Sequence, residues 1–521
     1  MSPTERASAS GPTGAPAPAP ATTGAPAPAA DIVDLRSALA VIADDPAHYR
    51  ATSVPIDPHA QLAGVYRHLG AGGTVARPTR RGPAMLFESI VGYPGARVLV
   101  GLMADRARVA KLFGTTPRDV ARALVAALDA PLPPVLTSAP AGCQEVVHRA
   151  DEPGFDIRRL LPAPTNTPED AGPYFCLGLL QGSDPETGHT DVTIHRICVQ
   201  GPDLLTIFFA PDRHIDAFRA KAEAADRPLP VSISMGLDPA VYIGACFEAP
   251  TTPLGYDELQ IAGGLRQRPV ELVRCLTIDQ TAIANAEIVI EGELLPNERM
   301  REDATTDSGR AMPEYPGYLG PAHPSLPIMR VTAVTTRAEP ILQTLVGPGE
   351  EHTSLAGIPT EASILRALDA ALPGLITNAY AHTAGGGKLL LVLQACKRRA
   401  FDDGMVRQAA LVALGTYREL KNVVLVDDDV DLFDSDDVLW AMTTRLQGNR
   451  DIIAIPGLAG HILDPSQQPS YDPTLPAAGT TSKTVFDATV PFALRDNFRR
   501  APFADVDPTP WAAQTPSGAT A

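Results

Sequence analysis

Hydrophobic and polar residues alternate clearly over residues 190–200, which read Thr-Asp-Val-Thr-Ile-His-Arg-Ile-Cys-Val-Gln. A period of two over this length predicts a β-strand with one buried face. Asp191 and Arg196 are five positions apart, so a regular strand presents them on opposite faces. Charged residues in a half-buried strand need partners, because burying an unpaired charge is costly. Ordinary surface ion pairs would meet that need, and residues elsewhere decide between this interpretation and a functional site.

Patterns on either side of this strand predict three folded parts. Helix and strand signals alternate over residues 31–165, which predicts an α/β domain. Strand signals dominate residues 166–325 with few long helices between them, which favours a barrel-like β domain over a parallel sheet. Residues 326–480 alternate again and predict a second α/β domain. The expected strands are 84–90, 97–103, 174–180, 191–200, 204–210, 231–235, 270–275, 286–294, 388–395 and 422–426, and the expected helices are 34–42, 104–113, 117–128, 256–266, 361–371, 402–413 and 436–445.

The two ends of the chain differ from these parts in composition. Residues 1–30 are almost entirely Ala, Pro, Gly, Ser and Thr. Such a segment buries too little apolar surface to offset the entropy of ordering, so we expect it to be disordered. Residues 481–521 are expected to form a C-terminal arm and tail, in which 483–498 docks as a closing arm or a dimer contact.

Composition narrows the classes of partner. The formal net charge of -17 at pH 7 argues against nucleic acid or an anionic membrane as the main partner. No apolar run reaches the roughly 18 residues of a spanning helix, and no secretory signal is evident. The six cysteines are widely spaced without a C-x-x-C pair, so neither disulfides nor a structural zinc site is expected. These features together predict a cytoplasmic protein.

Common nucleotide and metal motifs fail when their spacing is tested. The stretch Ala-Gly-Gly-Gly-Lys ending at Lys388 resembles a phosphate-binding loop, but the spacing requires glycine where His382 stands and Ser or Thr where Leu389 stands. We therefore interpret it as a tight turn entering a strand. The glycines of 70–73 lack the third glycine of a dinucleotide fingerprint, and the acidic run 427–431 lacks the glycine of a calcium loop.

One ordered set of motifs remains. The stretch from Asp191 to Arg196 is followed by His214, by Glu258-x-x-x-Ala-Gly, by Glu314-Tyr-Pro-Gly-Tyr, and by Asp-Asp-Val-Leu-Trp-Ala-Met-Thr-Thr-Arg at 436–445. This series resembles the UbiD family of reversible decarboxylases from about residue 31 to about residue 507. Within the family the chain looks closest to bacterial protocatechuate (3,4-dihydroxybenzoate) decarboxylases. The stretches that carry this closer likeness are 62–68, 244–253 and 311–314.

The resemblance implies a fold and a cofactor. It implies an N-terminal α/β domain, a central split β-barrel of the flavin-reductase-like kind that binds the cofactor, and a C-terminal α/β domain. The implied cofactor is prenylated FMN (prFMN), whose phosphate is held through Mn²⁺ (or Mg²⁺) with K⁺ nearby. The implied metal ligands are Asp191, His214 and Glu258, and two carboxylates with an imidazole suit such an ion. Many relatives carry Asn at the first position, so Asp191 adds a negative charge beside the phosphate.

The resemblance also assigns cofactor contacts. Lys397, at the end of an expected strand, is a candidate for the flavin phosphate, although a surface lysine fits that position equally well. The other implied cofactor-binding residues are Thr193, Ile194, His195, Arg196, Arg213 and His214.

A Glu–Arg–Glu network carries the reaction in the family. Arg196 matches the arginine, which would hold the substrate carboxylate, and Glu314 matches the acid that returns a proton to the ring. The second acid is Glu302 or, as a fallback, Asp307, because the loop between 298 and 314 is longer here than in compact relatives. The sequence does not identify the residues that would bind the hydroxyl groups of the substrate ring. His323, His352 and His461 are candidates that also fit ordinary loop histidines.

The implied activity is non-oxidative decarboxylation of protocatechuate to catechol and CO₂, reversible at high bicarbonate. Loss of CO₂ from an aromatic ring leaves electrons in an sp² orbital, so a cofactor must act as the electron sink. Gallate, 4-hydroxybenzoate or a heteroaromatic acid are alternative substrates, and a catalytically silent flavin-binding scaffold is the alternative of another class. The implied partners are a flavin prenyltransferase that supplies the cofactor and a second copy of the chain, in a dimer or hexamer.

Overall fold

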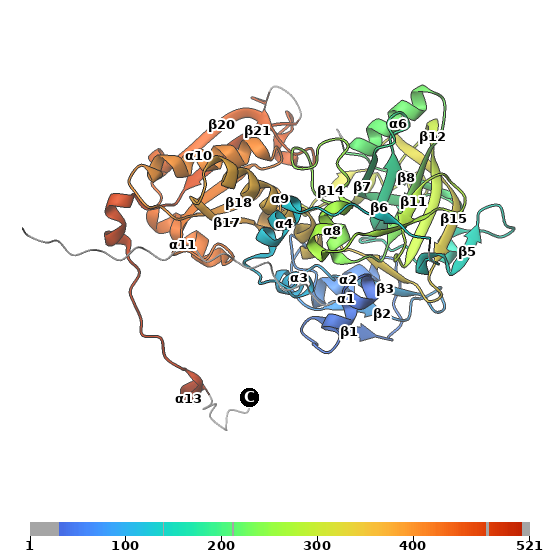
Figure 1. Ribbon diagram of the computed structural model, residues 1–521, viewed down its shortest axis with the longest axis horizontal. Helices are drawn as coiled ribbons and strands as arrows, with labels where there is room; N and C mark the ends of the chain where they lie inside the picture. Colours follow the sequence, from blue (N-terminus) through green and yellow to red (C-terminus); the bar gives the residue numbers. More distant parts are fainter. Residues whose placement is uncertain (1–30, 139, 211–212, 472, 476–478, 513–521) are drawn as a thin grey trace, which may run out of the picture.

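The computed structural model describes residues 31–138, 140–210, 213–471, 473–475 and 479–512 (Figure 1). Residues 1–30, for which we predicted disorder, lie outside the described residues. In Figure 1 the N-terminal strands are blue, the central barrel is green and yellow, and the C-terminal sheet is orange. No helix in the described ranges has the length and apolar character needed to cross a bilayer.

The centre of the chain forms a closed antiparallel barrel, as predicted. Its strands follow the order β12-β9-β6-β7-β8-β15, and pairing between β12 and β15 closes the ring. Branched and aliphatic side chains such as Ile197, Ile233 and Ile290 fill its interior. The strands are β6 (Tyr174–Ser183), β7 (Thr190–Val199), β8 (Leu204–Ile207), β9 (Leu229–Met235), β12 (Ile288–Met300) and β15 (Leu326–Thr336), with β5 (Val146–Arg149) added beside β15.

A bulge in β15, where Thr332 has no opposing residue on β12, bends the barrel wall. The pairing between β12 and β15 shifts register between Glu291 and Gly292. A Cβ atom at Gly292 would lie 2.3 Å from the Arg330 carbonyl oxygen, so only glycine permits this close approach of the two strands. Strand β12 continues to Met300, and the residues that follow it return to Arg196 on β7.

The first sheet takes one strand from beyond the barrel. Its order is β1-β2-β3-β16, where β16 (Ile341–Thr344) pairs with β3 in parallel. Both β15 and β16 fall in the range 326–480, which we expected to form the C-terminal domain. The sequence pattern predicted neither of these two strands. The other members are β1 (Tyr49–Thr52), β2 (Ala84–Phe87) and β3 (Arg97–Val100), covered by α1 (Leu35–Ile42), α2 (Gln61–Leu69), α3 (Arg106–Phe113) and α4 (Val120–Asp129).

The C-terminal sheet has the order β17-β18-β19-β21-β20. Its three central strands are parallel, and both edge strands run antiparallel to them. The segment 483–498, expected as a docked arm, differs: it contributes most of β21, which lies between β19 and β20. The elements are β17 (Ile376–Ala381), β18 (Leu390–Ala395), β19 (Asn422–Asp427), β20 (Ile452–Ala459), β21 (Thr480–Asp487), α10 (Asp402–Thr416), α11 (Ser435–Arg445) and α12 (Gly448–Asp451).

Helix α9 (Glu350–Ala371) starts eleven residues before the predicted 361–371. Its first half contains Gly357 and Pro359 and is buried almost throughout, so it lacks the polar face that marks an amphipathic helix. The helix contacts α4, β17 and α10, and its burial comes from this central position.

Short elements complete the connections. They are α5 (Ile157–Leu160), α6 (His214–Ala224), α7 (Pro239–Gly244), α8 (Leu259–Arg266) and α13 (Thr509–Ala512), the sheet of β4 (Val135–Leu136), β10 (Glu271–Arg274) and β11 (Thr281–Ile283), the hairpin of β13 (Arg310–Pro313) and β14 (Leu319–Pro321), and the 3₁₀ turns η1 (Gly142–Gln144), η2 (Thr383–Gly385), η3 (Pro465–Gln467) and η4 (Phe492–Phe498).

Candidate active site

Two adjoining pockets lie where the barrel meets α9 and the C-terminal sheet. They share Thr193, Arg213 and Glu248 as a common wall. Arg196 and Glu314 line the first pocket, which we call the reaction pocket. We call the other, which contains the expected metal ligands, the metal pocket.

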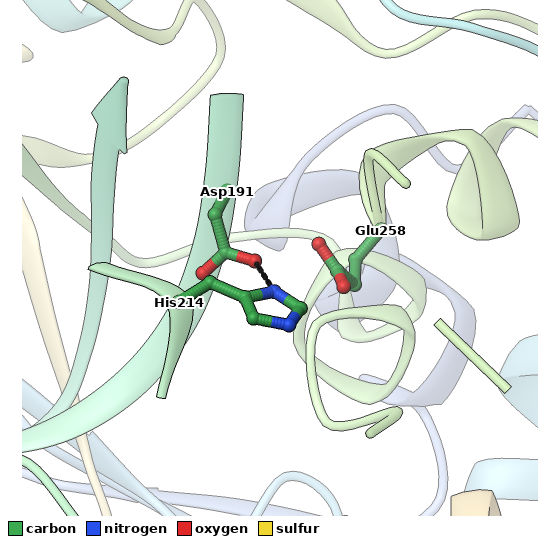
Figure 2. Close-up of side chains that lie close together, drawn as sticks. All are labelled: Asp191, His214 and Glu258. Carbon is green, nitrogen blue, oxygen red and sulfur yellow. Dashed lines mark hydrogen bonds and ion pairs between the residues drawn. The ribbon is translucent and has the colours of Figure 1, made fainter. Parts of the chain in front are cut away.

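The three expected metal ligands come together from separate elements (Figure 2). Asp191 lies on β7, His214 is the first residue of α6, and Glu258 immediately precedes α8. Their candidate ligand atoms all lie within 4.8 Å of one another, and His214 Nδ1 is 2.9 Å from Asp191 Oδ1. Both carboxylates are buried. More than 60 residues separate Asp191 from Glu258, so only folding creates this cluster.

The cluster fits a divalent cation. Glu258 Oε2 is buried and has no hydrogen-bond partner among the described residues. Burial, and then the neighbouring charge of Asp191, raise the pKa of Glu258 well above its usual value. A cation bound between the two carboxylates would remove this conflict, and oxygen ligands with one imidazole suit Mn²⁺ or Mg²⁺.

Arg196 is held between two glutamates in the reaction pocket. Its Nε lies 2.9 Å from Glu302 Oε1, its Nη2 donates to Glu302 Oε2 at 3.1 Å, and its Nη1 forms an ion pair with Glu314. The guanidinium also stacks on Phe208, with Cζ 4.1 Å from the ring centroid. Burial alone would lower the pKa of Arg196, but the charges of Glu314 and Glu302 raise it, so the side chain stays cationic.

Glu302 is buried and held by hydrogen bonds, unlike a solvent-exposed acid in a loop. Its carboxylate is fully buried and accepts hydrogen bonds from the Tyr174 hydroxyl and the His323 backbone N–H, both at 3.0 Å. Asp307, the fallback, is 81% exposed and pairs with Arg301. The geometry therefore places Glu302, and not Asp307, beside Arg196.

The two glutamates differ in their access to the pocket. Glu314 lines the reaction pocket and its side chain is 13% exposed, whereas Glu302 does not line it and is 0% exposed. A proton can therefore pass between Glu314 and a bound ligand. Glu302 can act only through Arg196.

A buried chain of alternating charges forms the wall between the pockets. Arg213 donates to Glu248 at 2.7 Å, and Lys388 Nζ lies 3.2 Å from the same carboxylate oxygen. Lys388 also forms an ion pair with Glu419, whose other oxygen is 3.1 Å from His461 Nε2. Sequence reasoning missed Lys388, Glu248 and Glu419, because the glycine-rich stretch before Lys388 was tested only as a phosphate loop.

Lys397 does not belong to the site. Its Nζ lies 3.1 Å from Asp403 and 3.4 Å from Asp427, and it lines neither pocket. Lys388 precedes β18 and Lys397 follows it, which puts the two lysines on the order of 25 Å apart. The pockets lie at the Lys388 end. The sequence did not show which end of the strand would face them.

The remaining expected contacts lie at the pocket wall. Thr193, Ile194, His195 and Arg213 all line the reaction pocket. Burial, and then the charge of Arg213, lower the pKa of His195 to about 3, so its imidazole is neutral at physiological pH. Of the three histidines considered for ring hydroxyls, His352 and His461 line this pocket and His323 does not.

Removing the Lys388 charge is expected to destabilise the fold. In the Lys388→Met variant, Glu248 and Glu419 share a buried site without their common cation, which should lower the free energy of unfolding by about 3 kcal/mol at pH 7. Urea unfolding would measure this. Lys421→Met is the matched control, since Lys421 forms a more exposed pair with Asp464.

The loss of unfolding free energy in Lys388→Met should depend on pH. Although burial opposes it, Lys388 holds the pKa values of Glu248 and Glu419 below their ordinary 4.5, so this stabilisation is present above pH 4.5 and disappears in acid. The difference between Lys388→Met and the parent should therefore persist from pH 7 down to 4.5 and shrink as the pH falls below 4.5. A loss that is independent of pH, or no larger than that of Lys421→Met, would contradict the role of this ion chain.

Three sequence profiles of one family match successive parts of the chain. They are the N-terminal domain of 3-octaprenyl-4-hydroxybenzoate carboxy-lyase over residues 44–128, its Rift-related domain over 135–350, and its C-terminal domain over 353–488. The chain belongs to the UbiD family of carboxy-lyases.

Relatives narrow the class further. A structure of the apo 3,4-dihydroxybenzoic acid decarboxylase from Enterobacter cloacae is 62% identical, covers 92% of this chain and 99% of its own, and has a TM-score of 0.89. Gallate decarboxylase of Lactiplantibacillus plantarum is 50% identical over 91% of this chain and 97% of its own. An evolved dimeric form of the UbiD-class enzyme HmfF from Pelotomaculum thermopropionicum, in complex with prFMN, is 32% identical, covers 91% of this chain and 97% of its own, and has a TM-score of 0.76. The protein is an aromatic acid decarboxylase of the UbiD type.

Proposed function

We propose that this protein catalyses the reversible, non-oxidative decarboxylation of 3,4-dihydroxybenzoate to catechol and CO₂. The observation that carries the proposal is the reaction pocket, in which Arg196 is held by Glu302 and paired with Glu314 at the wall. The 62% identity to a 3,4-dihydroxybenzoic acid decarboxylase supports this substrate.

The proposed cofactor is prFMN, which when bound supplies the electron sink that loss of CO₂ from an aromatic ring requires. Thr193, Ile194 and His195 would contact it, and Asp191, His214 and Glu258 would hold the divalent ion, Mn²⁺ or Mg²⁺, that binds its phosphate. K⁺ is proposed to bind nearby. The unpartnered Glu258 Oε2 supports the ion assignment, and the complex of HmfF with prFMN supports the cofactor.

Each catalytic residue has one task in this proposal. Arg196 holds the substrate carboxylate by charge-assisted hydrogen bonds, while Glu302 fixes the guanidinium in place. Once CO₂ has left, the Glu314 carboxylic acid transfers its proton to the ring carbon, and in the carboxylation direction it removes the ring proton. The Phe208 ring covers one side of Arg196 and restricts water there.

Further polar groups of the reaction pocket suit the two ring hydroxyls. Lys388, His352 and His461 line the same pocket, and His352 Nδ1 and the buried Tyr315 hydroxyl have no hydrogen-bond partner among the described residues. Burial lowers the pKa of His352, so its neutral imidazole can accept a hydrogen bond from a phenol. We propose that these groups select hydroxylated rings over benzoate itself.

Gallate is the second candidate substrate. It differs from 3,4-dihydroxybenzoate by one further hydroxyl, and the 50% identity to a gallate decarboxylase supports it. The proposed partners are a flavin prenyltransferase, which must supply prFMN, and a second copy of the chain in a homo-oligomer. The dimeric form of HmfF supports the oligomer.

The function is tested by producing the protein together with a flavin prenyltransferase and following CO₂ release from 3,4-dihydroxybenzoate, gallate, 4-hydroxybenzoate and benzoate. We expect release from 3,4-dihydroxybenzoate only in the preparation with prFMN, with unprenylated FMN as the control. Faster release from gallate would move the assignment to the second candidate. Bound prFMN without release from any of these acids would contradict both.

A further inference from the structure

Asp191 and Glu258 form an acidic site without a compensating basic side chain (Figure 2). Within the described residues, the ion pairs of Lys and Arg side chains include neither carboxylate, and Asp191 contacts only the imidazole of His214. Arg213 and Arg418 line the metal pocket, where Arg213 binds Glu248, and in the adjoining pocket Lys388 binds Glu248 and Glu419. Ligands of a cation bind in their deprotonated forms, and in that form the two carboxylates and the imidazole carry two negative charges.

This charge affects the order in which ion and cofactor can enter. A flavin phosphate placed in the metal pocket would add up to two more negative charges beside two buried carboxylates, and like charges at such distances repel strongly when water is scarce. A divalent cation is instead attracted to the site, since two carboxylates neutralise its charge completely. The empty ligand set therefore attracts the ion and repels the phosphate.

We propose that the protein binds its divalent ion before the flavin and independently of it, and that the Asp191 charge makes this possible. The ion-loaded site then accepts the cofactor phosphate. This inference rests on the metal ligands assigned in the proposed function. Asparagine at position 191 would keep one oxygen ligand but leave a singly charged site, which would depend on the phosphate to hold the ion.

The test titrates Mn²⁺ into the full-length, flavin-free protein after treatment with EDTA. Isothermal titration calorimetry, or the electron paramagnetic resonance signal of free Mn²⁺, reports binding. We expect one ion per chain, and at least tenfold weaker binding by Asp191→Asn. Asp216→Asn is the matched control, because Asp216 lies on the same helix as His214 but pairs with Arg219, and its Mn²⁺ affinity should change less than twofold.

A second titration uses FMN as the probe, with and without Mn²⁺. We expect FMN to bind the parent at least tenfold more tightly when Mn²⁺ is present. Equal melting temperatures of Asp191→Asn and the parent in EDTA would show that the variant folds. Mn²⁺ binding that occurs only with FMN present, or equal Mn²⁺ affinity of Asp191→Asn and the parent, would overturn the inference.

The variant Glu258→Gln distinguishes failure of the proposed binding order from failure of the assignment of the metal ligands. If Glu258 is a ligand, this variant binds Mn²⁺ at least tenfold more weakly whether or not FMN is present. Parent-like binding by Glu258→Gln under both conditions would show that the ion lies elsewhere, which removes the ligand set and the inference together. Loss of binding by Glu258→Gln, combined with an absolute requirement of the parent for FMN, would refute only the binding order.

Discussion

Replacing Arg196 by alanine is expected to lower kcat/KM for decarboxylation by at least about 10³-fold, because the substrate carboxylate loses its bidentate partner. Arg196→Lys keeps the charge but not the planar fork, so we expect it to recover only a small part of the rate. Turnover should be measured alongside bound Mn²⁺. Since Arg196 is not an expected metal ligand, metal content should match that of the parent.

Folding must be controlled in this experiment, because removing Arg196 leaves Glu302 buried without its cation. The double variant Arg196→Ala, Glu302→Gln replaces that charge by an amide that keeps the shape of the side chain. It should regain the melting temperature of the parent but not its activity. Substantial turnover by either variant would refute the role of Arg196 in holding the substrate.

Changing Glu314 to glutamine is expected to lower kcat by about 10³-fold, since the amide cannot deliver a proton to the ring. Binding should change little, because glutamine preserves the size of the side chain. Exchange of catechol ring hydrogen for deuterium in D₂O follows proton transfer without any need for CO₂ release. Under the proposed mechanism, Glu314→Gln abolishes this exchange.

Glu302→Gln is the matched comparison for Glu314→Gln, since it removes the other acid of the network. Glu302 does not line the reaction pocket, so this variant should misplace Arg196 and impair turnover of 3,4-dihydroxybenzoate more than ring exchange of catechol, which has no carboxylate. If Glu302→Gln abolished exchange and Glu314→Gln did not, the roles of the two acids would be reversed.

Much of the fold could be predicted because its cause is local. The alternation of residues 190–200 predicted β7, and a strand-rich centre predicted the barrel. Helix α9 was truncated in the prediction because burial on all sides removes the periodic signal. The position of β21 within its sheet depends on strand pairing over long sequence distances, which no local pattern records.

The same distinction applies to the site. The family resemblance indicated Asp191, His214 and Glu258, and the structure brings them together. Sequence could not choose between Glu302 and Asp307, because the choice depends on where β12 ends and how the following loop turns. The sequence suggested Lys397 and not Lys388, although both flank one strand, because only the packing of the sheet against the barrel shows which end faces the pockets.

The residues that line the reaction pocket come from two different parts of the chain. Arg196 and Glu314 belong to the central part of the chain, whereas Lys388 and His461 belong to the segments of the C-terminal sheet. Apart from Tyr315, the groups proposed to meet the ring hydroxyls are thus encoded by a later stretch of the gene than the groups proposed for the chemistry. Recombination or mutation in the C-terminal stretch can alter which aromatic acid is accepted while the machinery for releasing CO₂ is inherited intact. A single scaffold of this kind can therefore give rise to decarboxylases for many different aromatic acids.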